Sequence, residues 1–267
     1  HPFTINFSRD DVRITTNYHA DMVASSRFSV IHEGGHALYE LHTGRELARS
    51  NLGTGVSMGI HESQSRFYEN IIGRSRAFCS VIYPWLKEHF APRLDHVTED
   101  DFYRMINKSE PSLIRTEADE LTYCLHIMVR YELEKRMFDG SLTAHDLPAE
   151  WNRLYKEYLG IDVPDDRQGV LQDSHWANGN IGYFPSYAIG SAYGAQYLLE
   201  LSKELDVDAV VRSGDLTPIN NWLEDRIWKH GCMKDPVALF ESVCGKFDPD
   251  CYVAYLEKKF TEVYGLS

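Results

Sequence analysis

Two histidines four residues apart, His32 and His36, enclose a glutamate in the stretch His-Glu-Gly-Gly-His. On an α-helix, positions i and i+4 lie on nearly the same face, about 40° apart around the axis and about 6 Å along it. Two imidazoles so placed can share one tetrahedral metal ion such as zinc. Glu33 lies on the flank of that face, where its carboxylate can reach a metal-bound water without being a ligand. The spacing therefore predicts a zinc hydrolase centre with Glu33 as the general base.

The alternative for this segment is a helix with packed polar side chains and no metal, because a motif with three fixed positions also occurs by chance. The surrounding residues argue against it. Apolar side chains flank the motif, and an unpaired His-Glu-His set in a buried helix would cost several kcal/mol of lost solvation. Gly34 and Gly35 each cost about 1 kcal/mol of helix propensity. Bare backbone beside a metal leaves room for a substrate chain, which would explain both glycines.

A zinc site with two histidines needs a third protein ligand, which leaves one position for water. His42 follows His36 by six residues, as in the zinc proteases whose motif runs H-E-x-x-H-x-x-G-x-x-H. Tyr39 stands where that motif has a glycine that breaks the helix, so the helix should continue. We therefore expect His42 to point away from the metal and to stabilise the C-terminal end of the helix.

Glu62 is the predicted third ligand. It begins a second helix after a glycine-rich connection long enough to reverse direction, so an antiparallel second helix would place it opposite both histidines. The alternative is a solvent-facing glutamate of the kind that helix starts favour. Glu69, two turns further on, is a candidate to orient one of the ligand histidines through a hydrogen bond.

Composition limits the classes of protein that fit this chain. Its 267 residues can form one large domain or two small ones, and 43% hydrophobic with 25% charged residues is ordinary for a globular protein. A net charge of −13 without a Lys or Arg cluster argues against a nucleic-acid partner. No apolar run approaches the about 18 residues of a membrane span, and no secretory leader opens the sequence. Five widely spaced cysteines without a C-x-x-C pair favour free thiols, so we expect a cytoplasmic protein.

Hydrophobic periodicity predicts a mainly α-helical fold with short polar connections. A short strand is expected within 8–18, where β-branched and polar residues alternate. The metal-binding helix is expected from about 19 to 42, and 51–60 is expected to be a strand or loop along which an extended peptide can lie. Residues 160–185 are expected to be irregular. Further helices are predicted over 62–76, 78–90, 99–107, 113–138, 145–158, 187–205, 218–229, 236–243 and 251–264.

The metal-binding motif is one of five separated motifs that together span much of the chain. They are Asp11-Val-Arg13-Ile-Thr15, His32-Glu33-Gly-Gly-His36, His61-Glu62-Ser-Gln64, Ile114-Arg115-Thr-Glu-Ala118-Asp119 and Gly169-Val-Leu-Gln172-Asp173-Ser-His175-Trp176. In this order they resemble the motifs of the M32 metallocarboxypeptidases, the family of thermostable carboxypeptidase Taq. Five motifs are far more specific than the zinc motif alone. The family's chains have about twice this length, and the motifs fall in their C-terminal half.

The resemblance implies a zinc-dependent or cobalt-dependent exopeptidase that removes single residues from peptide C-termini with broad preference, sparing proline, and forms a homodimer. The implied fold is a mainly α, zincin-like helical peptidase related to the neurolysin and angiotensin-converting-enzyme group, with a small β element lining the active-site groove. We expect residues 1–267 to form a single catalytic domain. This domain would be the C-terminal portion of a longer family fold whose N-terminal half is absent from the chain.

Catalysis also needs donors besides the metal for the oxyanion that develops on the substrate. His175, Tyr183 and Tyr187 are the candidates, from the stretch HWANGNIGYFPSY. The alternative for each is an ordinary, partly buried side chain with one satisfied hydrogen bond. Gln172 and Asp173 are expected to hold the preceding loop rather than to do chemistry.

An exopeptidase must also bind the free carboxylate of its substrate, and the planar fork of an arginine does this best. Arg115 is the first candidate and is supported by the resemblance, and Arg13 in the short strand is the second. The alternative for each is a structural ion pair, of Arg115 with Asp119 or of Arg13 with Asp11. Both roles can coexist.

Two other functions fit the same residues. A zinc endopeptidase or oligopeptidase would carry the same metal centre in a groove open at both ends. Replacing Arg115 separates it from an exopeptidase, because only an exopeptidase would lose activity on free-acid peptides and keep it on amidated ones. A non-catalytic metal-binding scaffold would fill the water position with a fourth protein ligand, whereas the intact Glu33 favours catalysis.

Overall fold

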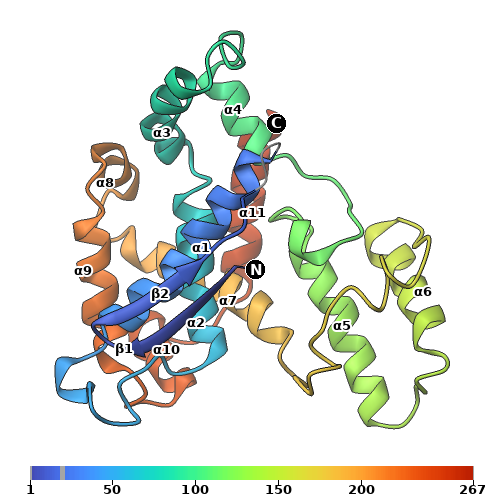
Figure 1. Ribbon diagram of the computed structural model, residues 1–267. Helices are drawn as coiled ribbons and strands as arrows, with labels where there is room; N and C mark the ends of the chain where they lie inside the picture. Colours follow the sequence, from blue (N-terminus) through green and yellow to red (C-terminus); the bar gives the residue numbers. More distant parts are fainter. Residues whose placement is uncertain (1, 19–21, 267) are drawn as a thin grey trace. The chain divides into compact units, whose positions relative to one another are not determined.

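The computed structural model describes residues 2–18 and 22–266, and these residues form a mainly helical protein with one small sheet (Figure 1). This confirms the predicted fold class. No helix among the described residues is long and apolar enough to cross a membrane. The α-helices are α1 (Val23–Leu41), α2 (Met58–Arg66), α3 (Arg76–His89), α4 (Glu99–Ile106), α5 (Tyr123–Phe138), α6 (Leu147–Leu159), α7 (Pro185–Leu201), α8 (Val207–Ser213), α9 (Thr217–Arg226), α10 (Pro236–Cys244) and α11 (Asp250–Tyr264).

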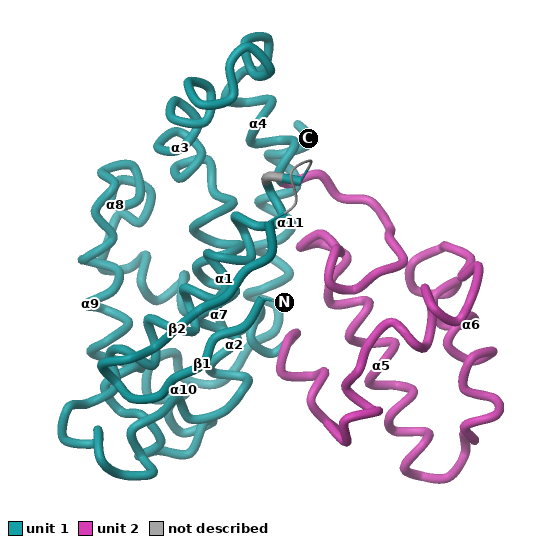
Figure 2. Tube along the Cα trace, in the orientation of Figure 1, with its two compact units in different colours: residues 1–106, 189–267 teal, residues 107–188 magenta. Residues whose placement is uncertain are grey.

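The chain divides into two compact units (Figure 2). Unit 1 comprises residues 1–106 and 189–267, and unit 2 comprises residues 107–188. Each unit has hydrophobic clusters of its own: the largest in unit 1 is built around Trp228 and Phe240, and the largest in unit 2 around Trp151. The single catalytic domain expected over the whole chain stays a prediction.

A two-stranded antiparallel hairpin opens unit 1. It consists of β1 (Phe3–Ser8) and β2 (Asp11–Thr15), with Ile5 opposite Arg13. The strand predicted within 8–18 is β2. The sequence FTINFS of β1 alternates apolar and polar residues, which is the signal of a strand, but it was not predicted. Both strands pack on α1, so the hairpin lies beside the helix that is predicted to bind the metal (Figure 1).

Helix α1 carries the His-Glu-Gly-Gly-His motif. Its end agrees with the prediction, while the expected start near residue 19 lies outside the described residues. His42 is the C-terminal cap of α1, and its Nδ1 donates to the carbonyl of Leu38 at 2.7 Å. This position at the helix end is the one predicted for His42.

Helix α2 begins four residues before Glu62. Its first residue is Met58, because the hydroxyl of Ser57 caps the helix by accepting a hydrogen bond from the backbone N–H of Ile60. The segment expected as a strand or loop over 51–60 is therefore a loop up to Ser57, and its last residues belong to α2.

The helix predicted over 113–138 is wrong in its first part. A 3-10 turn covers Arg115–Glu117, and the α-helix α5 starts only at Tyr123. The reason is the side chain of Asp119, which accepts hydrogen bonds from the backbone N–H groups of Leu121 and Thr122 and so competes with helical pairing. Arg115 therefore does not lie on a long helix.

The helices predicted over 62–76 and 187–205 are also too long. α2 ends at Arg66, and a π-helical turn, Phe67–Ile72, continues the chain. α7 ends at Leu201, and Asp206 caps the separate helix α8, which was not predicted. The other predicted helices agree with the structure to within three residues at each end.

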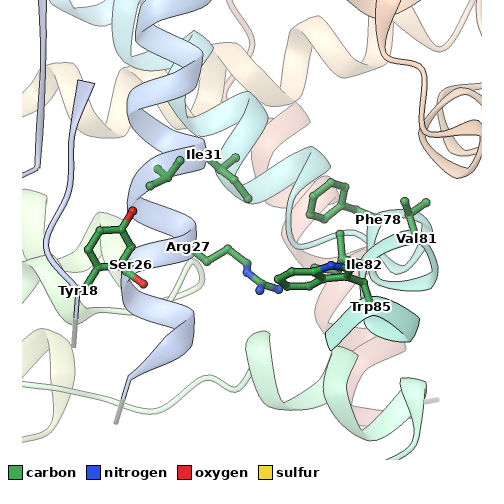
Figure 3. A pocket seen from close by; sticks show the side chains of 9 residues that line it. Tyr18, Ser26, Arg27, Ile31, Phe78, Val81, Ile82 and Trp85 are labelled. Atoms are coloured by element: carbon green, nitrogen blue, oxygen red, sulfur yellow. The ribbon is translucent and has the colours of Figure 1, made fainter. Parts of the chain in front are cut away.

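An apolar hollow of about 540 Å³ lies on unit 1 beside α1 and α3 (Figure 3). Ile31, Phe78, Ile82 and Trp85 line it, with Arg27 at its side. No predicted site residue is among the described residues that line this hollow. The hollow is therefore separate from the metal-binding motif, although α1 contributes to both.

Candidate active site

His32, His36 and Glu62 come together as predicted from their spacing. One ligand atom from each lies within 4.8 Å of the others. Glu62 Oε2 is 3.7 Å from His32 Nε2 and 3.4 Å from His36 Nε2. Two imidazole nitrogens and one carboxylate oxygen are a donor set of catalytic zinc sites, so these residues fit a divalent metal ion. In the part of the chain that the structure describes, no other three His, Cys, Asp or Glu side chains converge in this way.

The ionisation of Glu62 and His36 suits metal binding, whereas His32 has to lose a proton to bind a metal. Burial alone would raise the pKa of Glu62, but the charges of His32 and Arg66 hold this pKa well below its usual range. Burial lowers the pKa of His36, which favours its neutral form. Burial would also lower the pKa of His32, yet nearby Glu62 and the hydrogen bond that His32 donates to Glu69 raise it. An ionised carboxylate and neutral imidazoles are the forms that bind metal.

Glu69 orients His32, as the sequence indicated. Glu69 Oε2 is 2.9 Å from His32 Nδ1. Such a carboxylate holds the proton of the imidazole on Nδ1, so that Nε2 is free to face Glu62. Glu69 lies within the π-helical turn Phe67–Ile72, and turns of this kind are frequent at functional sites.

The β hairpin contacts the predicted general base. Thr4 of β1 donates its hydroxyl to Glu33 Oε2 at 2.6 Å, and the same hydroxyl lies 3.0 Å from the backbone carbonyl of Glu33. Glu33 is only 8% exposed. The hairpin therefore fixes the direction of the Glu33 carboxylate.

The two glycines of the motif serve different purposes. A Cβ added at Gly34 would meet nothing within 4 Å, whereas one at Gly35 would lie 2.7 Å from Gln64 O and from Ser65 Cα. Gly35 therefore allows α1 and α2 to approach closely. The open space expected beside the metal applies to Gly34 only.

The sequence assigned no role to His61, which contacts the cluster, or to Glu40, which contacts His61. His61 Nδ1 is 2.9 Å from His36 Nδ1, and His61 Nε2 is 2.6 Å from Glu40 Oε1. Burial alone would raise the pKa of Glu40, but hydrogen bonds from His61 and from the backbone of Gly55 lower it. The sequence did contain two signals for these residues. Glu40 follows His36 by four residues and so lies on the same helix face, and His61 directly precedes Glu62.

Arg115 belongs to unit 2 and is 6% exposed. Its Nε and Nη2 donate to Asp173 Oδ1 at 3.0 and 2.8 Å, and its Nη1 donates to the hydroxyl of Tyr123 at 3.0 Å. The ion-pair partner is thus Asp173 and not Asp119, whose carboxylate accepts from Ser109 and from backbone N–H groups. The guanidinium of Arg115 meets protein partners on each of its three nitrogens.

Gln172 and Asp173 hold their loop, as expected. Asp173 Oδ2 accepts from Arg130 Nε at 2.6 Å, and Gln172 Oε1 accepts from Arg130 Nη2 and from the backbone of Arg115, both at 2.9 Å. Burial would raise the pKa of Asp173, but the charges of Arg130 and Arg115 lower it. One carboxylate therefore bridges two arginines inside unit 2.

Arg13 belongs to unit 1 and has a more exposed side chain, at 67%. Its Nε and Nη2 donate to the two carboxylate oxygens of Asp11 at 2.8 and 2.7 Å. This ion pair is the structural alternative that the sequence offered. The side chain of Arg13 nevertheless remains largely open to solvent.

The three candidate oxyanion donors lie together in unit 2. His175 Nε2 is 3.0 Å from the hydroxyl of Tyr187, and the rings of His175 and Tyr183 are 5.4 Å apart between centroids. Burial and the charge of Arg115 lower the pKa of His175, which favours a neutral ring. The three predicted metal ligands and Glu33 belong to unit 1.

The fold and this cluster place the chain in a class of mainly helical proteins that carry the His-Glu-x-x-His signature of metallopeptidases. A family comparison agrees. The chain belongs to the carboxypeptidase Taq (M32) metallopeptidase family, whose model matches residues 1–260. The resemblance seen in the five motifs is thereby confirmed.

Individual relatives show the same family. The chain is 44% identical over 266 residues to Carboxypeptidase 1 of Bacillus subtilis, covering 99% of this chain and 53% of that protein. It is 44% identical over 268 residues to Thermostable carboxypeptidase 1 of Thermus thermophilus, covering 99% and 52%. The crystal structure of an M32 carboxypeptidase from Deinococcus radiodurans R1 matches with a TM-score of 0.97 at 40% identity, covering 99% and 54%. The chain spans about half the length of the curated relatives that it matches.

Proposed function

We propose that this chain is a zinc-dependent carboxypeptidase that releases single residues from peptide C-termini with broad specificity. The observation that carries the proposal is the convergence of His32, His36 and Glu62, with Glu33 directly after His32 in the sequence. These three ligands would hold zinc, with cobalt as the second candidate. When bound, a metal of this kind polarises the scissile carbonyl and lowers the pKa of water.

Glu33 is proposed to take the proton of the attacking water and to deliver it to the leaving amine. The hydrogen bond from Thr4 engages Oε2, so Oε1 is the oxygen proposed to accept the proton. His175, Tyr183 and Tyr187 are proposed to donate hydrogen bonds to the oxyanion. Their mutual contacts support a shared role. The homodimer, the single catalytic domain and the cytoplasmic location stay predictions from the sequence.

Metal removal tests the proposed function. Protein stripped with a chelator is expected to release no amino acid from N-blocked dipeptides, and added zinc or cobalt is expected to restore release. Free amino acids are measured, with the corresponding dipeptide amides as the control. Internal cleavage of longer amidated peptides would favour an endopeptidase or oligopeptidase. Zinc bound without any cleavage would favour a non-catalytic metal-binding scaffold.

Arg13 and Arg115 are the proposed anchors for the substrate carboxylate, and the contacts around them favour Arg13. Arg13→Ala is expected to lower kcat/KM for free-acid dipeptides about 10-fold to 100-fold, because a hydrogen-bonded charged group contributes about 1.5 to 3 kcal/mol. The measurement compares free-acid with amidated peptides, and Arg13→Lys keeps the charge without the fork. An equal loss on both kinds of peptide would contradict the role of Arg13 as carboxylate anchor.

Gly190 of α7 offers a test of Glu62 as a ligand. A Cβ at Gly190 would lie 2.7 Å from Cβ and Cγ of Glu62, whereas one at Gly194 on the same helix would meet its nearest atoms at 3.5 Å. We expect Gly190→Ala to displace the carboxylate and to weaken zinc binding about 10-fold or more, as other disturbances around metal ligands do. Competition with a chelator measures this. Gly194→Ala is the matched control, and equal zinc affinities of the two variants would count against Glu62.

A further inference from the structure

A line of three hydrogen-bonded side chains leads away from the metal-binding cluster within unit 1. His36 faces Glu62 through Nε2, at 3.4 Å, and faces His61 through Nδ1, at 2.9 Å. His61 in turn reaches Glu40 Oε1 through Nε2 at 2.6 Å. The side chains of His36, His61 and Glu40 are 12%, 13% and 5% exposed. These contacts are therefore largely shielded from water.

Glu40 is the fixed end of this line. Its Oε1 also accepts from the hydroxyl of Thr54 at 2.8 Å and from the backbone N–H of Gly55 at 2.9 Å, and its Oε2 accepts from the side-chain amide of Asn6 at 2.6 Å. An ionised carboxylate only accepts hydrogen bonds. His61 must therefore present a protonated Nε2 to Glu40.

The protonation of His61 then determines that of His36. A neutral imidazole with its proton on Nε2 has a bare Nδ1, which can only accept. His61 Nδ1 therefore accepts a hydrogen bond from His36 Nδ1–H. This tautomer leaves His36 Nε2 without a proton, as a metal ligand requires, whereas without a metal the ionised Glu62 at 3.4 Å favours a proton on that nitrogen. Glu69 gives His32 the same tautomer directly, whereas His36 receives it from Glu40 through an intervening imidazole.

The loop before α2 is shaped to admit the ring of His61. A Cβ added at Gly55 would lie 2.5 Å from Cδ2 and 2.6 Å from Nε2 of that ring. The ring of Tyr39 covers another side of His61, with centroids 4.8 Å apart. The orientation of His61 is thus determined by its surroundings and by both of its ring nitrogens.

We propose that His61 and Glu40 are positioning residues that fix the tautomer and the ring orientation of His36 and thereby strengthen metal binding. This inference rests on the proposed metal site, and it adds two residues to which the motif itself assigns nothing. The competing explanation is that the same contacts only pack α2 and its preceding loop against α1. The two explanations differ in what they expect of metal affinity in a protein that is folded.

Zinc affinity separates the positioning explanation from the packing explanation. It is measured by competition with a chelator on folded protein. His61→Phe removes the acceptor for His36 and is expected to weaken zinc binding about 10-fold to 100-fold. His61→Asn keeps an oxygen near the position of Nδ1 and is expected to recover part of that loss. Glu40→Gln keeps the shape without the charge and is expected to give a smaller loss than His61→Phe. His42→Asn, also on the α1 side but outside the line, is the control and should stay within about two-fold of wild type.

Nitrogen-15 NMR of the zinc-loaded protein at pH 8 gives a second readout. The expected tautomers are a proton on Nδ1 of His36 and on Nε2 of His61. A proton on Nδ1 of His61, or zinc bound through Nδ1 of His36, would overturn the proposal. Unchanged zinc affinity of His61→Phe, with only a loss of stability in urea, would overturn it too and leave the packing explanation.

One more variant separates this inference from the proposed metal site. Wild-type protein is expected to bind one zinc ion per chain against the chelator, and Glu62→Gln is expected to lose it. If both fail to bind zinc, the metal site itself is wrong and the positioning role falls with it. If wild type binds zinc, Glu62→Gln does not, and His61→Phe binds as wild type does, only the positioning role is wrong.

Discussion

Glu33→Gln is expected to retain zinc and to lose carboxypeptidase turnover. Glutamine has nearly the same shape as glutamate, and its amide oxygen can still accept the hydrogen bond from Thr4. It cannot take a proton from water. Because general base catalysis contributes typically 10²-fold to 10⁴-fold, we expect kcat to fall by about that factor. The measurements are the release of free amino acids from blocked dipeptides and the zinc content per chain.

Glu46→Gln is the matched control for this change. Glu46 is an exposed glutamate of the turn after α1, outside the cluster, so the same substitution there should alter kcat by no more than about two-fold. Unchanged turnover of Glu33→Gln would remove Glu33 from the mechanism. Loss of zinc in that variant would instead make Glu33 a ligand, which its contact with Thr4 argues against.

The convergence of the cluster could be predicted because its determinants are local. The four-residue spacing of His32 and His36 fixes their common face on any helix, and a helix start after a long glycine-rich connection is enough to bring Glu62 back. Glu69 was expected near the cluster on the same reasoning, although it lies in the π-helical turn that follows α2. These residues depend on helical geometry and on one reversal of the chain.

The supports of the cluster could not be predicted, because they depend on tertiary contacts. Thr4 reaches Glu33 from a strand 29 residues away in the sequence, and His61 reaches Glu40 from 21 residues away. The π-helical turn Phe67–Ile72 has no sequence signal in the periodicity of apolar residues. A side chain that touches a ligand histidine only after folding cannot be distinguished, in the sequence, from any other polar residue.

Arg115 shows a different limit of the sequence. Its spacing to Asp119 indicated an ion pair on one helix. The side chain of Asp119 instead accepts hydrogen bonds from nearby backbone N–H groups, so Arg115 and Asp119 both lie before the start of α5. The partner is Asp173, 58 residues further on. The motif containing Asp173 was recognised, but its pairing with the motif of Arg115 requires the fold of unit 2.

Asp173→Asn is expected to destabilise unit 2 by about 3 kcal/mol or more. Arg130 is fully buried and Arg115 is 6% exposed, and both ion pairs of Asp173 lie at 2.6 to 2.8 Å. Removing one partner of a buried pair leaves uncompensated charge, which costs about 3 to 5 kcal/mol. Here one carboxylate serves two arginines. Urea unfolding measures the total loss, and hydrogen exchange in α5 and α6 shows whether it lies in unit 2.

The difference in free energy of unfolding between wild type and Asp173→Asn depends on pH, and the sign of this dependence can be worked out. The pKa of Asp173 is lowered in the folded protein. Its contribution to stability is therefore fully present above the carboxyl pKa of the unfolded chain, about 3.9, and is lost as the pH falls through the lower pKa of the folded protein. Burial lowers the pKa of His126 in the same unit to about 3. The unfolded chain binds that proton near pH 6.5, so wild type and variant both lose stability between about pH 6.5 and pH 3. Their difference should stay constant down to about pH 4 and then shrink.

Asp139→Asn is the control, because Asp139 is an exposed residue at the end of α5 that bonds only to nearby Ser141. It should change the free energy of unfolding by less than about 0.5 kcal/mol. A loss in Asp173→Asn as small as in this control would mean that Arg115 does not depend on Asp173 for compensation. The guanidinium of Arg115 would then be available for a substrate carboxylate, as the sequence first indicated. A large loss instead means that Arg115 is needed for the structure of unit 2, and it leaves Arg13 as the carboxylate anchor to test.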